Sequence, residues 1–188
     1  MIISWLPDWL SADLSLISGF LTWIIVLAWL WKSGWKIQRR YFIEATQKPL
    51  TRNAIVWSAG IVGAIFFVAA QMRPGMPGVM TVAMIGALSA YVDARTHRLP
   101  NAYTLAMAIG VVLGVIVGGV ISPLWQQRLV GSLVGALIWF VPVALLNRLP
   151  GGMGGGDVKL APVLGAMVGS VSLHATVFAL ALSFVSAG

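Results

Sequence analysis

Pro150-Gly-Gly-Met-Gly-Gly-Gly-Asp157-Val-Lys-Leu160 is a glycine-rich run between two apolar segments. Five of the six residues after Pro150 are glycines, and the acidic Asp157 follows directly before a new apolar segment. The 188-residue chain has only five acidic residues, so an aspartate at this junction needs an explanation. Two are open from the local sequence: Asp157 is the N-cap of the helix that begins here, or its carboxylate takes part in chemistry.

The composition indicates a membrane protein. The chain is 59% hydrophobic and 9% charged, whereas a soluble domain carries about 25% charged residues. Apolar runs of about 18 residues recur, which is long enough to cross a bilayer. No alternation typical of barrel strands is visible, and lipid requires backbone groups to be hydrogen-bonded internally. We therefore predict an all-α polytopic membrane protein with about six to seven transmembrane helices.

The apolar runs predict where these helices lie. Two spans and a basic linker (32–52) form an N-terminal part, 1–72, and the remaining spans form a helical core, 73–188. Pro142 is expected to kink the span in which it lies. After the glycine run, Gly169 and Ser170 either break the apolar sequence into two elements or lie within one longer kinked helix. The expected spans are 14–31, 54–70, a third ending at Val92, 101–121, 129–146 and 158–168, followed by the remainder to 188.

The basic residues indicate which loops face the cytoplasm. The linker holds six of the twelve Lys and Arg residues, and part of it is expected to form an amphipathic helix on the membrane. With that linker in the cytoplasm, alternating spans place ten of the twelve on the same side, which agrees with the positive-inside rule. The N-terminus is then outside, and Asp93 and Asp157 share the cytoplasmic face. The net charge of +7 is explained by anionic lipid, so no nucleic-acid partner is expected.

Asp93 and Asp157 are the candidate catalytic residues. Both lie at expected helix ends, and a helix N-terminus favours a carboxylate such as that of Asp157. Two carboxylates brought close do not easily both ionise, so a neutral acid can work beside a carboxylate base in peptide hydrolysis. The glycines are expected to act as a hinge that lets Asp157 reach Asp93. The alternative for Asp93 is an interfacial charge paired with Arg95 or Arg98.

Other chemistry finds little support in the sequence. The chain has no cysteine, which excludes disulfides, thiolate metal sites and a cysteine nucleophile. His97 and His174 are expected at opposite faces, so no metal site and no cofactor is predicted. The serines have no neighbouring base, which gives a serine protease no support. Glycines spaced by four residues predict close helix packing (Gly110, Gly114 and Gly118; Gly131 and Gly135; Gly165 and Gly169).

Two motifs together resemble the type IV prepilin peptidases, which are GxGD aspartyl proteases of bacterial membranes. The first is Asp93 with Leu99-Pro100-Asn101 and Thr104, and the second is Gly154-Gly-Gly-Asp157-Val-Lys-Leu160. The resemblance covers roughly residues 80–185. It implies a multi-pass protein of the cytoplasmic (inner) membrane in which Asp93 and Asp157 cleave the leader peptide of prepilins or pseudopilins.

The resemblance also implies supporting roles for Gly154, Gly156, Pro100, Asn101 and Lys159. Lys159 would tune Asp157 or contact substrate carbonyls, and an anchoring role at the lipid surface is the alternative. Larger members of the family carry a cysteine-rich zinc domain and methylate the new N-terminus. This cysteine-free sequence resembles the short, peptidase-only form, so methyltransfer is not expected.

Three alternatives remain open at the level of sequence. Tyr91-Val-Asp93 and the GxGD run are also compatible with a presenilin-like intramembrane protease. A proton- or cation-coupled carrier would place ionisable groups near the bilayer midplane, where this sequence has none. An inactive scaffold of a pilus-assembly machine would retain the fold without cleaving any substrate.

Overall fold

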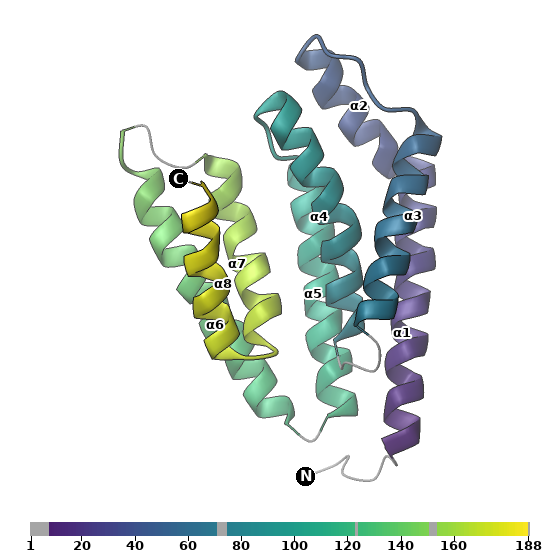
Figure 1. The fold of residues 1–188 in the computed structure, drawn as a ribbon, viewed down its shortest axis with the longest axis vertical. Helices are drawn as coiled ribbons and strands as arrows, with labels where there is room; N and C mark the ends of the chain where they lie inside the picture. The colour runs from purple at the N-terminus through teal and green to yellow at the C-terminus, as the bar shows by residue number, and fades with distance from the viewer. Residues whose placement is uncertain (1–7, 71–74, 123, 151–153, 188) are drawn as a thin grey trace.

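The computed structural model describes residues 8–70, 75–122, 124–150 and 154–187, and the regular structure in these ranges is entirely helical (Figure 1). Among the described residues, five helical segments are long and apolar enough to cross a membrane, and the expected all-α polytopic fold is confirmed. The helices are α1 Asp8–Trp29, the π-helix η1 Leu30–Gly34, α2 Trp35–Glu44, α3 Arg52–Ala69, α4 Met76–Thr96, α5 Asn101–Ile121, α6 Trp125–Asn147, α7 Gly155–Gly169 and α8 Leu173–Ala187.

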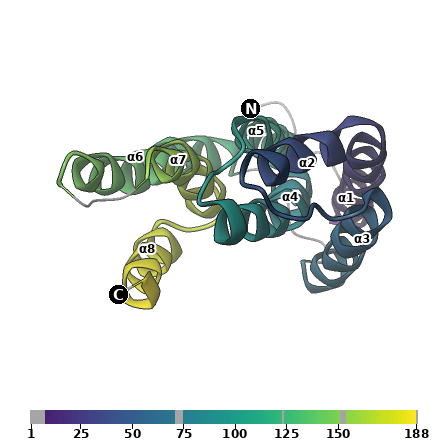
Figure 2. The same ribbon diagram turned by 90° about the horizontal axis from the view of Figure 1, so that it is seen from above.

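The helices form two groups that lie side by side (Figures 1 and 2). One group contains α1 to α5, and the other contains α6, α7 and α8. The main core lies around α4, whose side chains Met80, Met84 and Ile85 pack with Tyr103 and Met107 of α5 in an almost fully buried cluster. The two groups meet where α7 and α6 contact α5.

The first span does not end near Trp31 as expected. The helix continues from Leu10 to Glu44 over 35 residues, through the π-turn η1 and into α2. The predicted helix in the basic linker therefore exists, but its buried face packs against the protein. Phe42 stacks on Tyr91 of α4 with ring centroids 5.8 Å apart, and Gln38 Nε2 donates to the Leu50 carbonyl at 3.0 Å.

The glycines at four-residue spacing bring helices into backbone contact, as predicted. A Cβ on Gly114 of α5 would lie 2.7 Å from the backbone nitrogen of Gly78 in α4. Between α6 and α7, a Cβ on Gly135 or Gly165 would overlap the carbonyl oxygen of the other residue. Such approaches increase van der Waals contact in lipid, where no hydrophobic effect draws helices together.

The apolar sequence after Asp157 forms two helices, which decides between the two alternatives. α7 ends at Gly169, and α8 begins at Leu173. The indole Nε1 of Trp139 in α6 donates to the Thr176 carbonyl at 3.1 Å and so ties α8 to the second group. Pro142 lies inside α6, which continues past it to Asn147.

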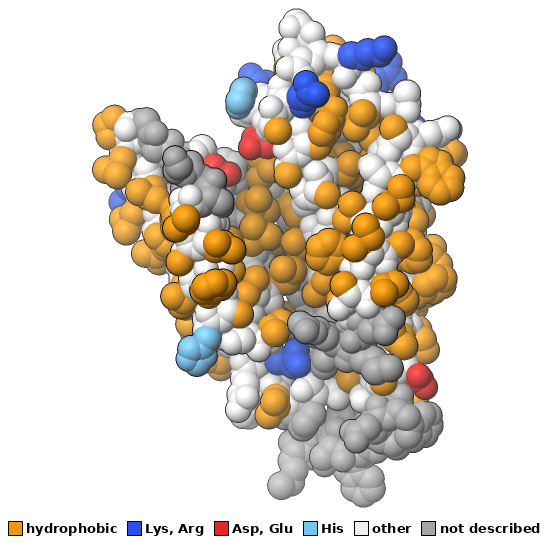
Figure 3. All heavy atoms as spheres, viewed as in Figure 1, with side chains coloured by type: hydrophobic (Ala, Val, Ile, Leu, Met, Phe, Trp, Pro, Cys, Tyr) orange, Lys and Arg blue, Asp and Glu red, His pale blue; other side chains and the backbone are white. Residues whose placement is uncertain are grey.

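Charged side chains gather at one end of the bundle. Figure 3 shows Lys and Arg side chains at the upper end of the visible face and hydrophobic side chains over its middle. We call this the basic end, and it carries α2, the α4–α5 loop (97–100) and the first turn of α7 (Figure 1). Asp93 and Asp157 both lie there, so their placement at one end of the molecule agrees with the sequence-based topology.

Candidate active site

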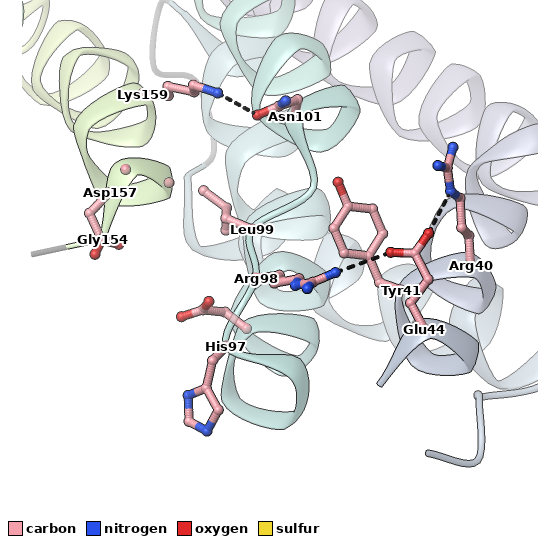
Figure 4. A pocket seen from close by; sticks show the side chains of 13 residues that line it. Arg40, Tyr41, Glu44, His97, Arg98, Leu99, Asn101, Gly154, Asp157 and Lys159 are labelled. Atoms are coloured by element: carbon pink, nitrogen blue, oxygen red, sulfur yellow. Dashed lines mark hydrogen bonds and ion pairs between the residues drawn. The ribbon is translucent and has the colours of Figure 1, made fainter. Parts of the chain in front are cut away.

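A pocket of about 470 Å³ opens at the basic end, where the two groups of helices meet (Figure 4). It is formed by α2, the end of α4 with the loop that follows, and the start of α7. Asp93 and Asp157 both line it. The lining residues are Arg40, Tyr41, Glu44, Asp93, His97, Arg98, Leu99, Asn101, Gly154, Gly155, Gly156, Asp157 and Lys159.

Asp93 lies in the last turn of α4. Its carbonyl accepts a hydrogen bond from the amide of His97 at 2.7 Å, and His97 ends the helix in the left-handed conformation with φ of 51°. This turn redirects the chain into the α4–α5 loop, which forms the next part of the pocket wall. The Asp93 side chain itself is partly exposed to the pocket.

Asp157 is in the first turn of α7. Gly154 is the N-cap, and its carbonyl accepts from the amide of Asp157 at 3.0 Å. The proposed capping role of Asp157 is therefore wrong, because no side chain caps this helix. The exposed carboxylate lies at the positive end of the helix dipole, which favours a negative charge there.

The glycines of the GxGD motif belong to the helix start rather than to an open loop. Gly155 and Gly156 are the first two residues of α7, and Gly154 has an extended conformation with φ of −66°. Only Gly156 needs the absence of a side chain: a Cβ there would lie 2.8 Å from Leu99 Cβ, whereas a Cβ on Gly155 would meet nothing within 4 Å. Gly151 and Gly152 lie outside the described residues, so the hinge hypothesis stays a prediction.

Pro100 and Asn101 start α5 and connect it to α7. Pro100 is the N-cap of α5, and its carbonyl accepts from the amide of Tyr103 at 3.0 Å. Asn101 Oδ1 accepts a hydrogen bond from Lys159 Nζ at 3.0 Å. The two sequence motifs thus touch through Asn101 and Lys159 and through the contact between Leu99 and Gly156. Lys159 is bound to Asn101, not to Asp157.

The positive charges of the pocket are paired with groups other than the two aspartates. Glu44 accepts from Arg40 Nε at 2.9 Å and from Arg98 at 3.2 Å. The expected pairing of Asp93 with Arg95 or Arg98 is not present, since the Arg95 guanidinium lies over the Tyr91 ring at 5.8 Å. Within the described ranges, neither Asp93 nor Asp157 forms a hydrogen bond or an ion pair through its carboxylate.

Three pocket residues come from a part of the chain that sequence reasoning did not assign to the site. Arg40, Tyr41 and Glu44 lie on α2 in the basic linker. The sequence feature that could have indicated this is Glu44, because it is the only acidic residue in a segment that also holds six basic residues. His97 is exposed and lines the pocket, whereas the exposed His174, expected at the opposite face, lines a separate pocket with residues of α6.

Two carboxylates that share one water-accessible pocket, with no partner among the described residues, are suited to acid–base chemistry. α4 supplies one carboxylate and α7 the other, so the pocket lies between elements of the two helix groups.

Residues 78–188 match the family model described as the type IV leader peptidase family. No curated protein and no solved structure is similar enough to be matched to the chain. The matched region begins at the third residue of α4 and continues through α8, so it contains both Asp93 and Asp157. It does not include α2.

Proposed function

The chain belongs to the type IV leader peptidase family, and on this basis we propose that it is a membrane aspartyl endopeptidase that removes the leader peptide of type IV prepilins or pseudopilins. Its family supports a peptidase, and its helices of spanning length support a membrane protein. The substrate class, the inner-membrane location and the use of an aspartate pair belong to the proposal.

The observation that carries the proposal is the shared pocket of Asp93 and Asp157, in which neither carboxylate is paired with another described residue. A structural aspartate at a helix end would cap the helix or bind a nearby cation, and among the described residues neither Asp93 nor Asp157 does so. Leaving two acidic groups without a partner at the junction of two helix groups is explained if they act on a ligand.

In the proposed reaction, one carboxylate accepts a proton from water while the other, protonated, donates a hydrogen bond to the scissile carbonyl oxygen. The water oxygen bonds to the carbonyl carbon, the carbon–nitrogen bond breaks, and the leaving amine takes up a proton. The assignment of acid and base belongs to the coupled pair rather than to either residue. The first turn of α7 directs its helix dipole toward the pocket and stabilises negative charge there.

The position of the pocket supports cleavage beside a membrane helix. Both aspartates lie at the basic end of the bundle, and the positive-inside rule favours the cytoplasm for that end. A substrate whose scissile bond lies just before an apolar helix would place that bond at this depth while the helix stays in the bilayer.

The test is cleavage of a candidate prepilin by the full chain in lipid vesicles. Asp93→Asn and Asp157→Asn should each lower the cleavage rate by about 10²–10⁴-fold, the usual contribution of a general acid or base. Asp13→Asn, the same change on the exposed start of α1, is the matched control and should retain activity. Helical content and vesicle insertion should be equal in all three variants.

The products distinguish the proposal from its alternatives. Mass spectrometry should locate the cut at the boundary between leader and apolar helix, whereas a presenilin-like protease would cut within the helix. Full activity in either aspartate variant would rule out the pair as the catalytic groups. Proton or cation flux without any cleavage would support a carrier.

A further inference from the structure

Glu44 links α2 to the α4–α5 loop at the edge of the candidate active site. Its carboxylate binds Arg40 on the same helix and Arg98, which lies 54 residues further along the chain. Figure 4 shows the Arg98 side chain directed toward Glu44 and away from Asp157. Glu44 lies outside the region 78–188 that matches the family model, so the family relationship assigns it no role.

The position of Glu44 is fixed by contacts on both sides. Phe42, two residues earlier, is buried and stacks on Tyr91. Gln47, three residues later, donates from Nε2 to the Arg95 carbonyl at 2.7 Å, just before the α4–α5 loop. α2 is thus attached to the end of α4 on both sides of Glu44, and its carboxylate is held beside the loop that carries Arg98.

Without Glu44, the Arg98 guanidinium could pair with the Asp93 carboxylate. Arg98 and Asp93 line the same pocket and are separated by five positions across a tight turn, and the Asp93 carboxylate has no other partner among the described residues. A guanidinium within about 4–6 Å of a carboxylate strongly favours its ionised form. Such a pairing would favour the ionised form of Asp93 and would make it harder for the pair to keep the proton that its acid must carry.

We infer that Glu44 is a positioning residue that holds the Arg98 guanidinium away from Asp93 and thereby keeps the carboxylate pair able to hold one proton. The inference rests on the proposed function, because it concerns the same pair. A segment outside the matched peptidase region would then control the protonation of the active site.

The charged and titratable groups around the pair are few. α2 contributes Arg40, Tyr41 and Glu44, the α4–α5 loop contributes His97 and Arg98, and α7 contributes Lys159, which Asn101 binds. When Glu44 loses its charge, Arg40 and Arg98 both lose their ion-pair partner. Arg40 lies on α2, whereas Arg98 lies on the loop that directly follows the α4 turn carrying Asp93. A freed Arg98 stabilises the doubly ionised pair, so the pair loses its proton at lower pH.

The experiment is the pH dependence of kcat for leader cleavage by the full chain in vesicles, from about pH 5 to 9. For Glu44→Gln we expect the alkaline limb to move toward lower pH by about one unit, which is the smaller end of the effect of a nearby arginine. Above that limb kcat should then fall by about tenfold, with KM little changed. Because exposed ion pairs contribute little to stability, the thermal unfolding midpoint should stay near that of the wild type.

A second substitution distinguishes this effect from a general change in charge or structure. Glu44→Gln combined with Arg98→Gln should restore the alkaline limb, because the freed guanidinium is gone. Glu44→Gln combined with Lys48→Gln is the matched control: it has the same net charge, and Lys48 is an exposed residue that does not line the pocket. This control should keep the shifted limb.

An unchanged profile in Glu44→Gln, or equal rescue by both double variants, would overturn the inference. Inactive Asp93→Asn and Asp157→Asn variants in the same assay would show that the proposed function survives that result. Activity in either aspartate variant would instead refute the proposed function itself.

Discussion

The contact between Gly156 and Leu99 makes a sharp prediction for a single methyl group. In Gly156→Ala the new Cβ would lie 2.8 Å from Leu99 Cβ, whereas ordinary carbon contacts are about 3.5–4.0 Å. The first turn of α7 must therefore move from the α4–α5 loop by about 1 Å, since Cβ is not the end of a flexible side chain. A misplacement of about 1 Å can lower the rate by about 10²-fold.

Gly155→Ala is a matched control one residue away on the same helix turn. Its Cβ would meet nothing within 4 Å, and both substitutions replace glycine by a better helix former, worth up to about 1 kcal/mol. We expect Gly155→Ala to keep its activity and to be slightly more stable. Gly156→Ala should lose activity and gain no stability, because overpacking costs about 1–3 kcal/mol.

The assay is the initial rate of leader cleavage at saturating substrate, together with the thermal unfolding midpoint in the same detergent or lipid. If Gly156→Ala cleaves within about twofold of the wild type, the Leu99 contact does not set the geometry of the site. If both variants lose activity equally, the flexibility of the glycine run matters more than its close packing, and the hinge hypothesis gains support.

Two further substitutions test how the scaffold holds this site. Tyr103→Phe removes the buried hydrogen bond from the Tyr103 hydroxyl to the Gly34 carbonyl, which is 3.0 Å long, and should lower the free energy of unfolding by about 1–2 kcal/mol; an unchanged denaturation midpoint would contradict this. Gly165→Ala places a Cβ against the Gly135 carbonyl, which belongs to a helix backbone, so folded yield should fall and stability drop by about 1–3 kcal/mol. Gly60→Ala is its control, because the new Cβ would lie 3.8 Å from the nearest heavy atom and stability should be unchanged or higher.

Much of this arrangement was predictable because a bilayer limits the possible folds. Apolar runs of spanning length alternate in direction, so counting them places Asp93 and Asp157 at the same end. Glycine spacing also has a direct structural meaning, because glycines four residues apart lie on one face of a helix and allow a neighbouring helix to pack closely there. Gly131 and Gly135 form such a face on α6, and Gly165 of α7 packs against it. The division of the chain at residue 72 stays a prediction, although residues from both parts line the pocket.

The features that were missed depend on tertiary packing or on weak local preferences. The pairing of Glu44 with Arg98 joins residues 54 positions apart, and a basic linker offers six possible partners to one carboxylate. Gly155 and Gly156 were expected in a loop because glycine is a poor helix former. The continuation of α1 into α2 was missed because hydropathy falls at Lys32, whereas a helix can continue from lipid into water.

The continuous helix from Leu10 to Glu44 packs against the protein both within its membrane-spanning part and within the basic linker. Its buried residues Val26, Leu30, Gly34, Gln38 and Phe42 recur every four residues. In an uninterrupted α-helix this spacing drifts by about 40° per step, so Phe42 would face about 160° away from Val26.

The π-turn at Leu30–Gly34 adds a residue without breaking the helix and reverses about 100° of this drift. The inward face of α1 is thereby brought to within about 60° of that of α2. The rotational setting of one turn thus determines which side of α2 meets α4, and with it which side chains face the pocket.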